Sequence, residues 1–290
     1  MSIKSTIKSL LLATFPNVVK NRIFKEQAHF SWDTLNEINN EPEVLVLEEI
    51  LAKHVDAVFL DVGCNKGEYT YAASKFLQPF NIFSFEPNPK LNYVLSKIFS
   101  DVNVLSYALS NEEIKAKFKV PSLNGYEDDS LGSLNTESKE TNETSADIFE
   151  VQCKRLDEVV ASYKIKRVDF IKIDVEGFEL SVLEGAQHTI EEHSPLLIIE
   201  IEKKNHKEHT VLEIINSINT KHQNKYKVFY FDISTYKVRE VSSEPSQNQA
   251  DWGTRKYVNN FLFIPIKNVI LNEIEELNTK LDRIFASKKN

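Results

Sequence analysis

The sequence AVFLDVGCNKG, which runs from Ala57 to Gly67, says more about the fold than any other stretch of the chain. Its first part, Ala57–Val62, is apolar apart from Asp61 and predicts a central parallel strand that is buried on both faces. Gly63 and Gly67 follow, where the backbone can turn tightly, and a helix is expected to begin near Gly67. A strand, a turn and a helix in this order begin a βαβ unit.

The chain continues this alternation of apolar runs and helical patterns in both directions from the βαβ unit. Further strands are expected at 81–85, 102–107, 115–120, 149–153, 168–173 and 195–201, and helices at 89–99, 156–163, 183–193 and 209–218. Strands at 227–232, 237–241 and 261–265 are expected to add antiparallel members. We therefore predict an α/β, Rossmann-like fold, with a mostly parallel seven-stranded sheet and helices on both faces.

The predicted domain, 56–267, is flanked by an N-terminal helical region, 1–55, and a C-terminal amphipathic helix within 268–290. Inside the domain, residues 121–147 are polar, acidic and rich in Ser, Thr and Asn, so a long loop or a partly disordered insertion is expected there. The C-terminal helix is expected to pack on the core or on a partner. Its apolar face carries Ile270, Ile274, Leu277, Leu281 and Ile284.

The composition indicates which partners and which cellular compartment to expect. The net charge is -8 and the pI is about 5.5, so a nucleic-acid partner is not expected. Cys64 and Cys153 are far apart, form no disulfide framework and have no metal-ligand spacing, which favours a reducing, cytoplasmic location. No apolar run is long enough to predict a transmembrane segment.

The glycine turn and the strand after it have the features of a nucleotide site. Nucleotides bind at the carboxyl ends of parallel strands, where Asp61 and Gly63 are expected to lie. The following helix offers free N–H groups to a carboxylate or phosphate, and Glu86, at the end of the next strand, is placed to accept hydrogen bonds from ribose hydroxyls. A plain strand-to-helix turn is the alternative. The spacing Gly-x-x-x-Gly favours S-adenosylmethionine (SAM) over a dinucleotide, whose pattern is Gly-x-Gly-x-x-Gly.

Longer motifs make the sequence similar to the FkbM family of SAM-dependent methyltransferases. They occur in the order of the family: FLDVGCNKGEYT (59–70), FSFEPNP (83–89), ALS (108–110), VDFIKIDVEGFELSVLEGA (168–186), LLIIEIE (196–202) and NNFLFIP (259–265). The resemblance implies a Rossmann-like class I methyltransferase fold, SAM as the cofactor, and O-methylation, often of a sugar or a natural-product hydroxyl. Residues 1–55, 121–147 and the C-terminal helix carry no family motif, and we expect them to set the choice of acceptor.

The same resemblance implies a cofactor site. It consists of a SAM loop (Asp61, Gly63, Asn65, Gly67), a ribose-binding acid (Glu86) and residues at the edge of the adenine (Ser106, Tyr107, Ala108). We also expect Thr70, just after the loop, to reach the carboxylate of SAM. Cys64 and Lys66 depart from the small or apolar residues that are usual in the family.

Charged residues at the ends of two predicted strands are the candidates for catalysis. Asp174 is expected to face the methyl group as a general base, a metal ligand or a cofactor-binding residue that holds the amino group of SAM. Glu176 is expected to contact the acceptor, Glu200 is placed to join them, and Lys172 is expected to pair with a carboxylate. Two or three such oxygens could bind Mg²⁺, but we predict no metal site. Hydrogen bonds that only stabilise the turns are the remaining alternative.

These features together predict a SAM-dependent O-methyltransferase that acts on a hydroxyl of a sugar, glycan or glycosylated metabolite. Methyl transfer to a protein or lipid and a non-catalytic SAM-fold interaction module are the alternatives. We expect a small-molecule or glycan acceptor and a homo-oligomer formed through the C-terminal helix. In the loop before the last strand, Trp252, Arg255 and Tyr257 either line a sugar site or simply pack against the core.

Overall fold

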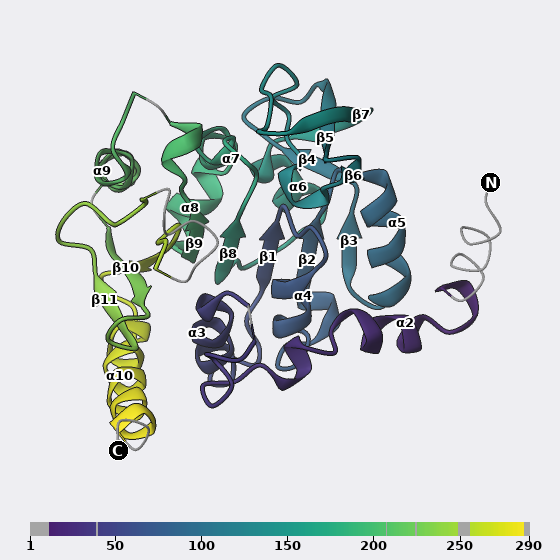
Figure 1. Cartoon of the computed structure of the whole chain (residues 1–290). Coiled ribbons are helices and arrows are strands. Elements are labelled where there is room, and N and C mark those ends of the chain that lie inside the picture. Colours follow the sequence, from purple (N-terminus) through teal and green to yellow (C-terminus); the bar gives the residue numbers. More distant parts are fainter. Residues whose placement is uncertain (1–11, 39, 207, 224, 249–255, 287–290) are drawn as a thin grey trace.

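The computed structural model describes residues 12–38, 40–206, 208–223, 225–248 and 256–286. Among these residues, eight strands form the main sheet in the order β11-β10-β12-β9-β8-β1-β2-β3 (Figure 1). The parallel members are β1 (Phe59–Val62), β2 (Ile82–Phe85), β3 (Asn103–Leu105), β8 (Phe170–Ile173) and β9 (Leu196–Glu200). The antiparallel members are β10 (Tyr226–Asp232), β11 (Lys237–Glu240) and β12 (Asn260–Pro265). The predicted mostly parallel α/β sheet is confirmed.

The main sheet has eight strands and not the seven predicted, and the strand expected at 237–241 lies at its edge. There β11 pairs with β10 as an antiparallel hairpin. The side chain of Val238 in β11 is buried, and its backbone makes two hydrogen bonds with the amide group of Asn278 in α10 (Ile270–Ala286). Because α10 covers the side chain and satisfies backbone groups, this edge strand is protected from solvent and from wrong pairing.

Residues 121–123, 126–127 and 143–147 belong to strands of a second sheet, so the prediction of a loop or disordered insertion was wrong for both ends of segment 121–147. Residues 128–142 between them form a loop with one short 3-10 helix, Asp129–Leu131. The sheet contains β4 (Tyr107–Leu109), β5 (Lys115–Leu123), β6 (Tyr126–Glu127) and β7 (Glu143–Lys154), with β5 and β7 antiparallel. Phe118 and Val120 of β5 pack with Val151 of β7 in a small buried cluster. Lys119, between Phe118 and Val120 in the sequence, is also buried, and its Nζ lies 2.8 Å from the carboxylate of Glu143. This pairing of distant segments orders a stretch whose composition is polar.

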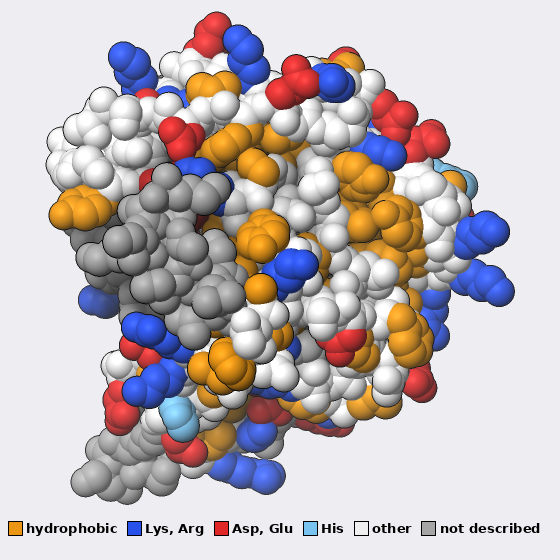
Figure 2. Space-filling view, turned by 90° about the vertical axis from the view of Figure 1, so that its right-hand side faces the viewer, with side chains coloured by type: hydrophobic (Ala, Val, Ile, Leu, Met, Phe, Trp, Pro, Cys, Tyr) orange, Lys and Arg blue, Asp and Glu red, His pale blue; other side chains and the backbone are white. Residues whose placement is uncertain are grey.

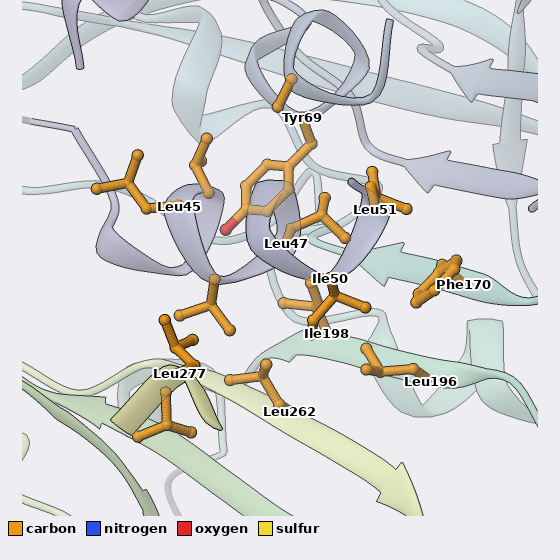
Figure 3. Close-up of a cluster of buried hydrophobic side chains, with 14 of the residues drawn as sticks. Leu45, Leu47, Ile50, Leu51, Tyr69, Phe170, Leu196, Ile198, Leu262 and Leu277 are labelled. Atoms are coloured by element: carbon orange, nitrogen blue, oxygen red, sulfur yellow. The ribbon is translucent and has the colours of Figure 1, made fainter. Parts of the chain in front are cut away.

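Helices cover both faces of the main sheet, as predicted. On one face lie α3 (Pro42–Leu51), α4 (Glu68–Ala73) and α10; on the other lie α6 (Leu156–Ser162), α7 (Glu179–Gly185), α8 (Gln187–His193) and α9 (Val211–Lys221). Figure 3 shows the first layer, where leucines of α3 face Phe170, Ile198 and Leu262 of the sheet and Leu277 of α10. α3 begins at Pro42, whose fixed φ suits the first helical position.

Two more helices, α5 (Pro89–Ile98) and α2 (Pro16–Ile23), lie beside the edge strand β3 and pack around Phe24, Leu95 and Phe99. Figure 2 shows this side of the molecule, where hydrophobic side chains are scattered among charged ones. Among the described residues, no helix is both long enough and apolar enough to cross a membrane. The two cysteines are buried and form no disulfide.

The C-terminal helix α10 has nearly the predicted bounds. Ile270, Ile274, Leu277 and Leu281 are buried in the chain's own core, together with residues of α3 and the sheet. The apolar face therefore packs on the core. A homo-oligomer formed through this helix stays a prediction, and it would use the remaining, polar face.

Candidate functional site

A cavity of about 460 Å³ lies at the carboxyl ends of β2, β1, β8 and β9. β1 sits between β2, which follows it in the sequence, and β8, which comes much later, so the strand order reverses here. This is the position where open α/β sheets bind ligands. The loops after these strands meet the start of α3 and the connection between β6 and β7 in the cavity wall.

Gly63 allows the turn after β1 to lie directly against the turn after β8. Its φ is +76°, and a Cβ at this position would lie 1.8 Å from the backbone oxygen of Asp174. Gly67 also has a positive φ, +86°, but its nearest neighbours are the side chains of Leu95 and Phe99, and it does not line the cavity. Gly63 therefore joins two turns of the site, whereas Gly67 packs the loop against α5 and the residue after it.

Asp61 is buried in the cavity wall, where hydroxyl groups hold it. Its Oδ2 accepts a hydrogen bond from Thr70 Oγ1 at 2.6 Å, and the same Thr70 oxygen lies 2.6 Å from Ser84 Oγ. Burial raises the pKa of Asp61 to about 7, although the hydrogen bond from Thr70 and the charge of Lys172 lower it. Thr70 is itself buried and does not line the cavity, so its contact is with Asp61 and not with the cavity space.

Glu86 directly follows β2, and its carboxyl group accepts hydrogen bonds from two backbone N–H groups. Oε2 accepts from the N–H of Asn65 at 2.9 Å, and Oε1 accepts from the N–H of Asn88 at 2.7 Å. Burial raises the pKa of Glu86 to about 8, while these two N–H groups lower it. The side-chain Oδ1 of Asn65 is also buried in this wall and has no hydrogen-bond partner in the described part of the chain. Carboxyl and amide oxygens are thus available to donors of a ligand.

The three residues expected beside an adenine are placed differently. Tyr107 and Ala108 line the cavity, whereas Ser106 is exposed and lies outside the wall. The reason is that the predicted strand over 102–107 is split, since the chain leaves the main sheet after β3 and enters the second sheet with β4. Ser106 is the residue between the two strands.

The second sheet closes one wall of the cavity. The backbone oxygen of Asp129 accepts a hydrogen bond from Asn65 Nδ2 at 3.2 Å, and its Oδ1 accepts one from Asn88 Nδ2 at 3.1 Å. On the opposite side, Ser133 Oγ donates to the backbone oxygen of Glu176 at 3.0 Å. The segment predicted as an insertion is therefore fastened to both the glycine loop and the turn after β8.

Asp174, Glu176 and Glu200 come together at the ends of β8 and β9. Each offers one carboxylate oxygen, and these atoms lie within 4.8 Å of one another. Burial, followed by the charge of Asp174, raises the pKa of Glu200 well above its usual value. Burial also raises the pKa of Glu176 to about 8, against the opposing charge of Lys204. Such a cluster can take up a proton or bind a cation.

Lys172 lies among these carboxylates, as predicted for a charged residue within an apolar strand. Its side chain is 1% exposed, and Nζ lies 2.5 Å from Asn260 Oδ1 and 3.7 Å from Asp174 Oδ2. Burial lowers the pKa of Lys172, but the charges of Asp174 and other nearby carboxylates outweigh this effect and raise it above the usual value. The ammonium group is therefore a fixed positive charge beneath the cluster.

Several residues of the wall were missed in the sequence. Lys204 Nζ lies 2.5 Å from Glu202 Oε2 and 3.4 Å from Glu176 Oε2. The start of α3 adds Glu41, which accepts a hydrogen bond from the hydroxyl of Tyr69 at 2.7 Å. The dipeptide Glu41-Pro42 indicates only a helix start, and Lys204 lies in a run of charged residues. The local sequence therefore does not predict a functional role for Glu41 or Lys204.

The last predicted loop contributes to the same wall. Asn259 Nδ2 donates a hydrogen bond to Glu200 Oε1, and Tyr257 lines the cavity. Trp252 and Arg255 lie outside the described residues. The motif NNFLFIP, which begins at Asn259, was the available signal, because it places two amides at the start of a strand beside β9.

The cavity has two ends of different chemistry. We name the "loop end" after the glycine loop; it comprises Asp61, Gly63, Asn65, Glu86, Tyr107 and Ala108. The "carboxylate end" comprises Glu41, Glu43, Lys172, Asp174, Glu176, Glu200, Glu202 and Lys204. The first offers hydrogen-bond acceptors and close backbone approach to a nucleoside, and the second offers groups that can accept a proton.

Comparison with known proteins places the chain in a family. Residues 61–228 match the family model described as the methyltransferase FkbM domain. The hexuronic acid methyltransferase AglP of Haloferax volcanii is 29% identical over 173 residues, which are 58% of this chain and 64% of AglP. The 2-O-methyltransferase NoeI of Sinorhizobium fredii is 27% identical over 152 residues, 48% of this chain and 61% of NoeI. The chain thus matches less than two thirds of the length of either relative.

Among solved structures, that of the methyltransferase FkbM from Methylobacillus flagellatus is similar, with a TM-score of 0.44 and 16% identity. The match covers 72% of this chain and 43% of that chain.

Proposed function

This chain belongs to the FkbM methyltransferase family, and from that premise we propose that it transfers a methyl group from SAM to a hydroxyl group of a sugar. The observation that carries the proposal is a single cavity whose loop end is suited to bind a nucleoside and whose carboxylate end holds proton acceptors. The names of the relatives support the two parts of this proposal, AglP a sugar acceptor by its hexuronic acid and NoeI a hydroxyl group by its O-methylation.

The loop end fits SAM on two observations. Asn65 Oδ1 is buried without a partner among the described residues, and the carboxyl group of Glu86 is fixed by two N–H groups beside it. In our proposal Glu86 accepts hydrogen bonds from the ribose, Tyr107 and Ala108 border the adenine, and the backbone at Gly63 approaches the methionine part. When bound, SAM supplies an electrophilic methyl group on a positively charged sulfur.

At the carboxylate end, Asp174 is the proposed base. Its side chain is 29% exposed and lines the cavity, and the ammonium group of Lys172 lies 3.7 Å from its Oδ2. Asp174 thus accepts the hydroxyl proton of the acceptor, which makes the oxygen a better nucleophile. Glu176 and Glu200, whose pKa values burial raises, orient the acceptor by hydrogen bonds.

Calorimetry tests the cofactor. We expect SAM and S-adenosylhomocysteine to bind and a nicotinamide dinucleotide not to bind. Glu86→Ala should weaken SAM binding about tenfold or more, because the hydroxyl groups of the ribose lose their acceptor. Glu150→Ala is the matched control, since Glu150 is 70% exposed and lies outside the cavity wall. Equal SAM affinity in the two variants would contradict the placement of the cofactor.

A further inference from the structure

The carboxylate end is unusually poor in available positive charge. Among the described residues of this wall, carboxyl groups outnumber ammonium groups, and they come from α3, the turn after β8 and the segment after β9. The pKa of Glu43 illustrates the crowding, since burial and then the charge of Glu41 raise it to about 8. A ligand that enters this end therefore meets groups that already resist further negative charge.

Both lysines of this end are already engaged by carboxylates. Lys172 is buried, donates a hydrogen bond to Asn260 and forms an ion pair with Asp174. Lys204 bridges Glu202 and Glu176. Lys66, the third lysine of the described wall, belongs to the glycine loop. Its positive charge acts to lower the pKa values of Glu68 and Asp129, which burial raises. Both described lysines of the carboxylate end are therefore already paired with carboxylates.

The same end suits an uncharged sugar ring. Carboxyl and amide oxygens can accept hydrogen bonds from hydroxyl groups, and protonated carboxyl groups can also donate. Phe178 and Tyr257, which are partly exposed, line the cavity and offer aromatic surface to the apolar face of a ring. A uronic acid of the same size would bring a carboxylate against carboxyl groups and would lose its hydration without gaining a cation.

We propose that this enzyme accepts sugars that carry no anionic group close to the methylated hydroxyl, and that hexuronic acids are excluded by the carboxylate end. The proposal rests on the proposed sugar O-methylation and adds the charge class of the acceptor. Glu202 acts through Lys204 as a specificity-determining residue, because its carboxylate keeps the ammonium group from an anionic ligand.

The test measures transfer of labelled methyl from SAM to matched pairs of p-nitrophenyl glycosides, such as glucoside with glucuronide and galactoside with galacturonide. We expect the neutral member of a pair to be methylated at least about tenfold faster, because the carboxylate of the uronide makes unfavourable contacts with the carboxyl groups of the enzyme. A uronide methylated as fast as its neutral partner, or faster, would overturn the inference and leave sugar O-methylation standing. Transfer to neither class, in protein that binds SAM, would instead overturn the proposed function and this inference with it.

A variant tests the role of the lysine. Glu202→Gln removes one of the two carboxylate partners of Lys204 and should raise the uronide-to-neutral rate ratio several-fold, without a change in SAM affinity. Glu150→Gln, at an exposed ion pair outside the cavity wall, is the matched control and should leave the ratio unchanged. If Glu202→Gln folds, binds SAM and keeps the wild-type ratio, the assignment of Glu202 and Lys204 to acceptor choice is wrong.

Discussion

The two ends of the cavity are built in different ways. The loop end comes mainly from the stretch of sequence around β1 and β2, to which β4 adds Tyr107 and Ala108. Backbone geometry, as at Gly63, and N–H groups that bond to Glu86 hold it. The carboxylate end gathers α3, the turn after β8 and the segment after β9, and ion pairs such as Lys204–Glu202 hold it. Backbone shape determines the loop end, and charge balance determines the carboxylate end. We therefore expect different substitutions to disrupt the two ends.

The largest effect on stability and on SAM binding is expected from a substitution at Gly63, where the turn after β1 lies against the turn after β8. Gly63→Ala would place a Cβ 1.8 Å from the backbone oxygen of Asp174, at a φ of +76°. We expect a destabilisation of about 3 kcal/mol or more and the loss of SAM binding. Gly125→Ala is the control, because its φ is also positive but no atom lies within 4 Å of the added Cβ. Chemical denaturation that gives equal losses for both variants would contradict the close approach of the turns.

The next largest effect should separate the ends functionally. Asp174→Asn keeps the size of the side chain but removes the base, so we expect turnover to fall by about a hundredfold or more. SAM affinity, set at the loop end, should change far less. Asp147→Asn, at an exposed ion pair with Lys90, should alter neither quantity. A variant Asp174→Asn that loses SAM binding and turnover in parallel would assign Asp174 to the cofactor and not to the acceptor.

A smaller effect should appear in the pH dependence of stability. Burial raises the pKa of Glu176 from 4.5 to about 8. Between these values the folded protein keeps a proton that the unfolded chain releases, so stability falls as the pH rises through this window. Glu176→Gln should remove about 1 to 2 kcal/mol of this fall, as measured by denaturation between about pH 5 and pH 8. Glu150→Gln, at an exposed position, should keep the wild-type slope, and an identical slope in Glu176→Gln would refute the raised pKa.

The smallest effect is expected from removal of divalent ions. Asp174, Glu176 and Glu200 could coordinate a metal ion by distance, but Lys172 and Lys204 already place positive charge among them. Methyl transfer should therefore be the same, within error, with EDTA and with added Mg²⁺. Activity that EDTA abolishes and Mg²⁺ restores would show that the carboxylate end is completed by a metal.

The sequence by itself determined the α/β fold, the position of the glycine turn and the cavity placement of Asp61, Glu86 and Asp174. These features are local, because each acid directly follows or ends an apolar strand, and parallel strands bring their carboxyl ends to one edge. The FkbM motifs followed the same order in the chain, and the family match bears out that resemblance.

Only the tertiary structure decided the rest. The second sheet depends on pairing of β5 with β7 across a polar stretch, and the contact of Thr70 with Asp61 depends on how α4 packs against the sheet. Glu41 and Lys204 reach the cavity from segments whose local sequence predicts only a helix start and a charged surface. The physical reason is that ion pairs and strand pairs between distant segments gain their energy from proximity, which the local pattern of residues does not encode.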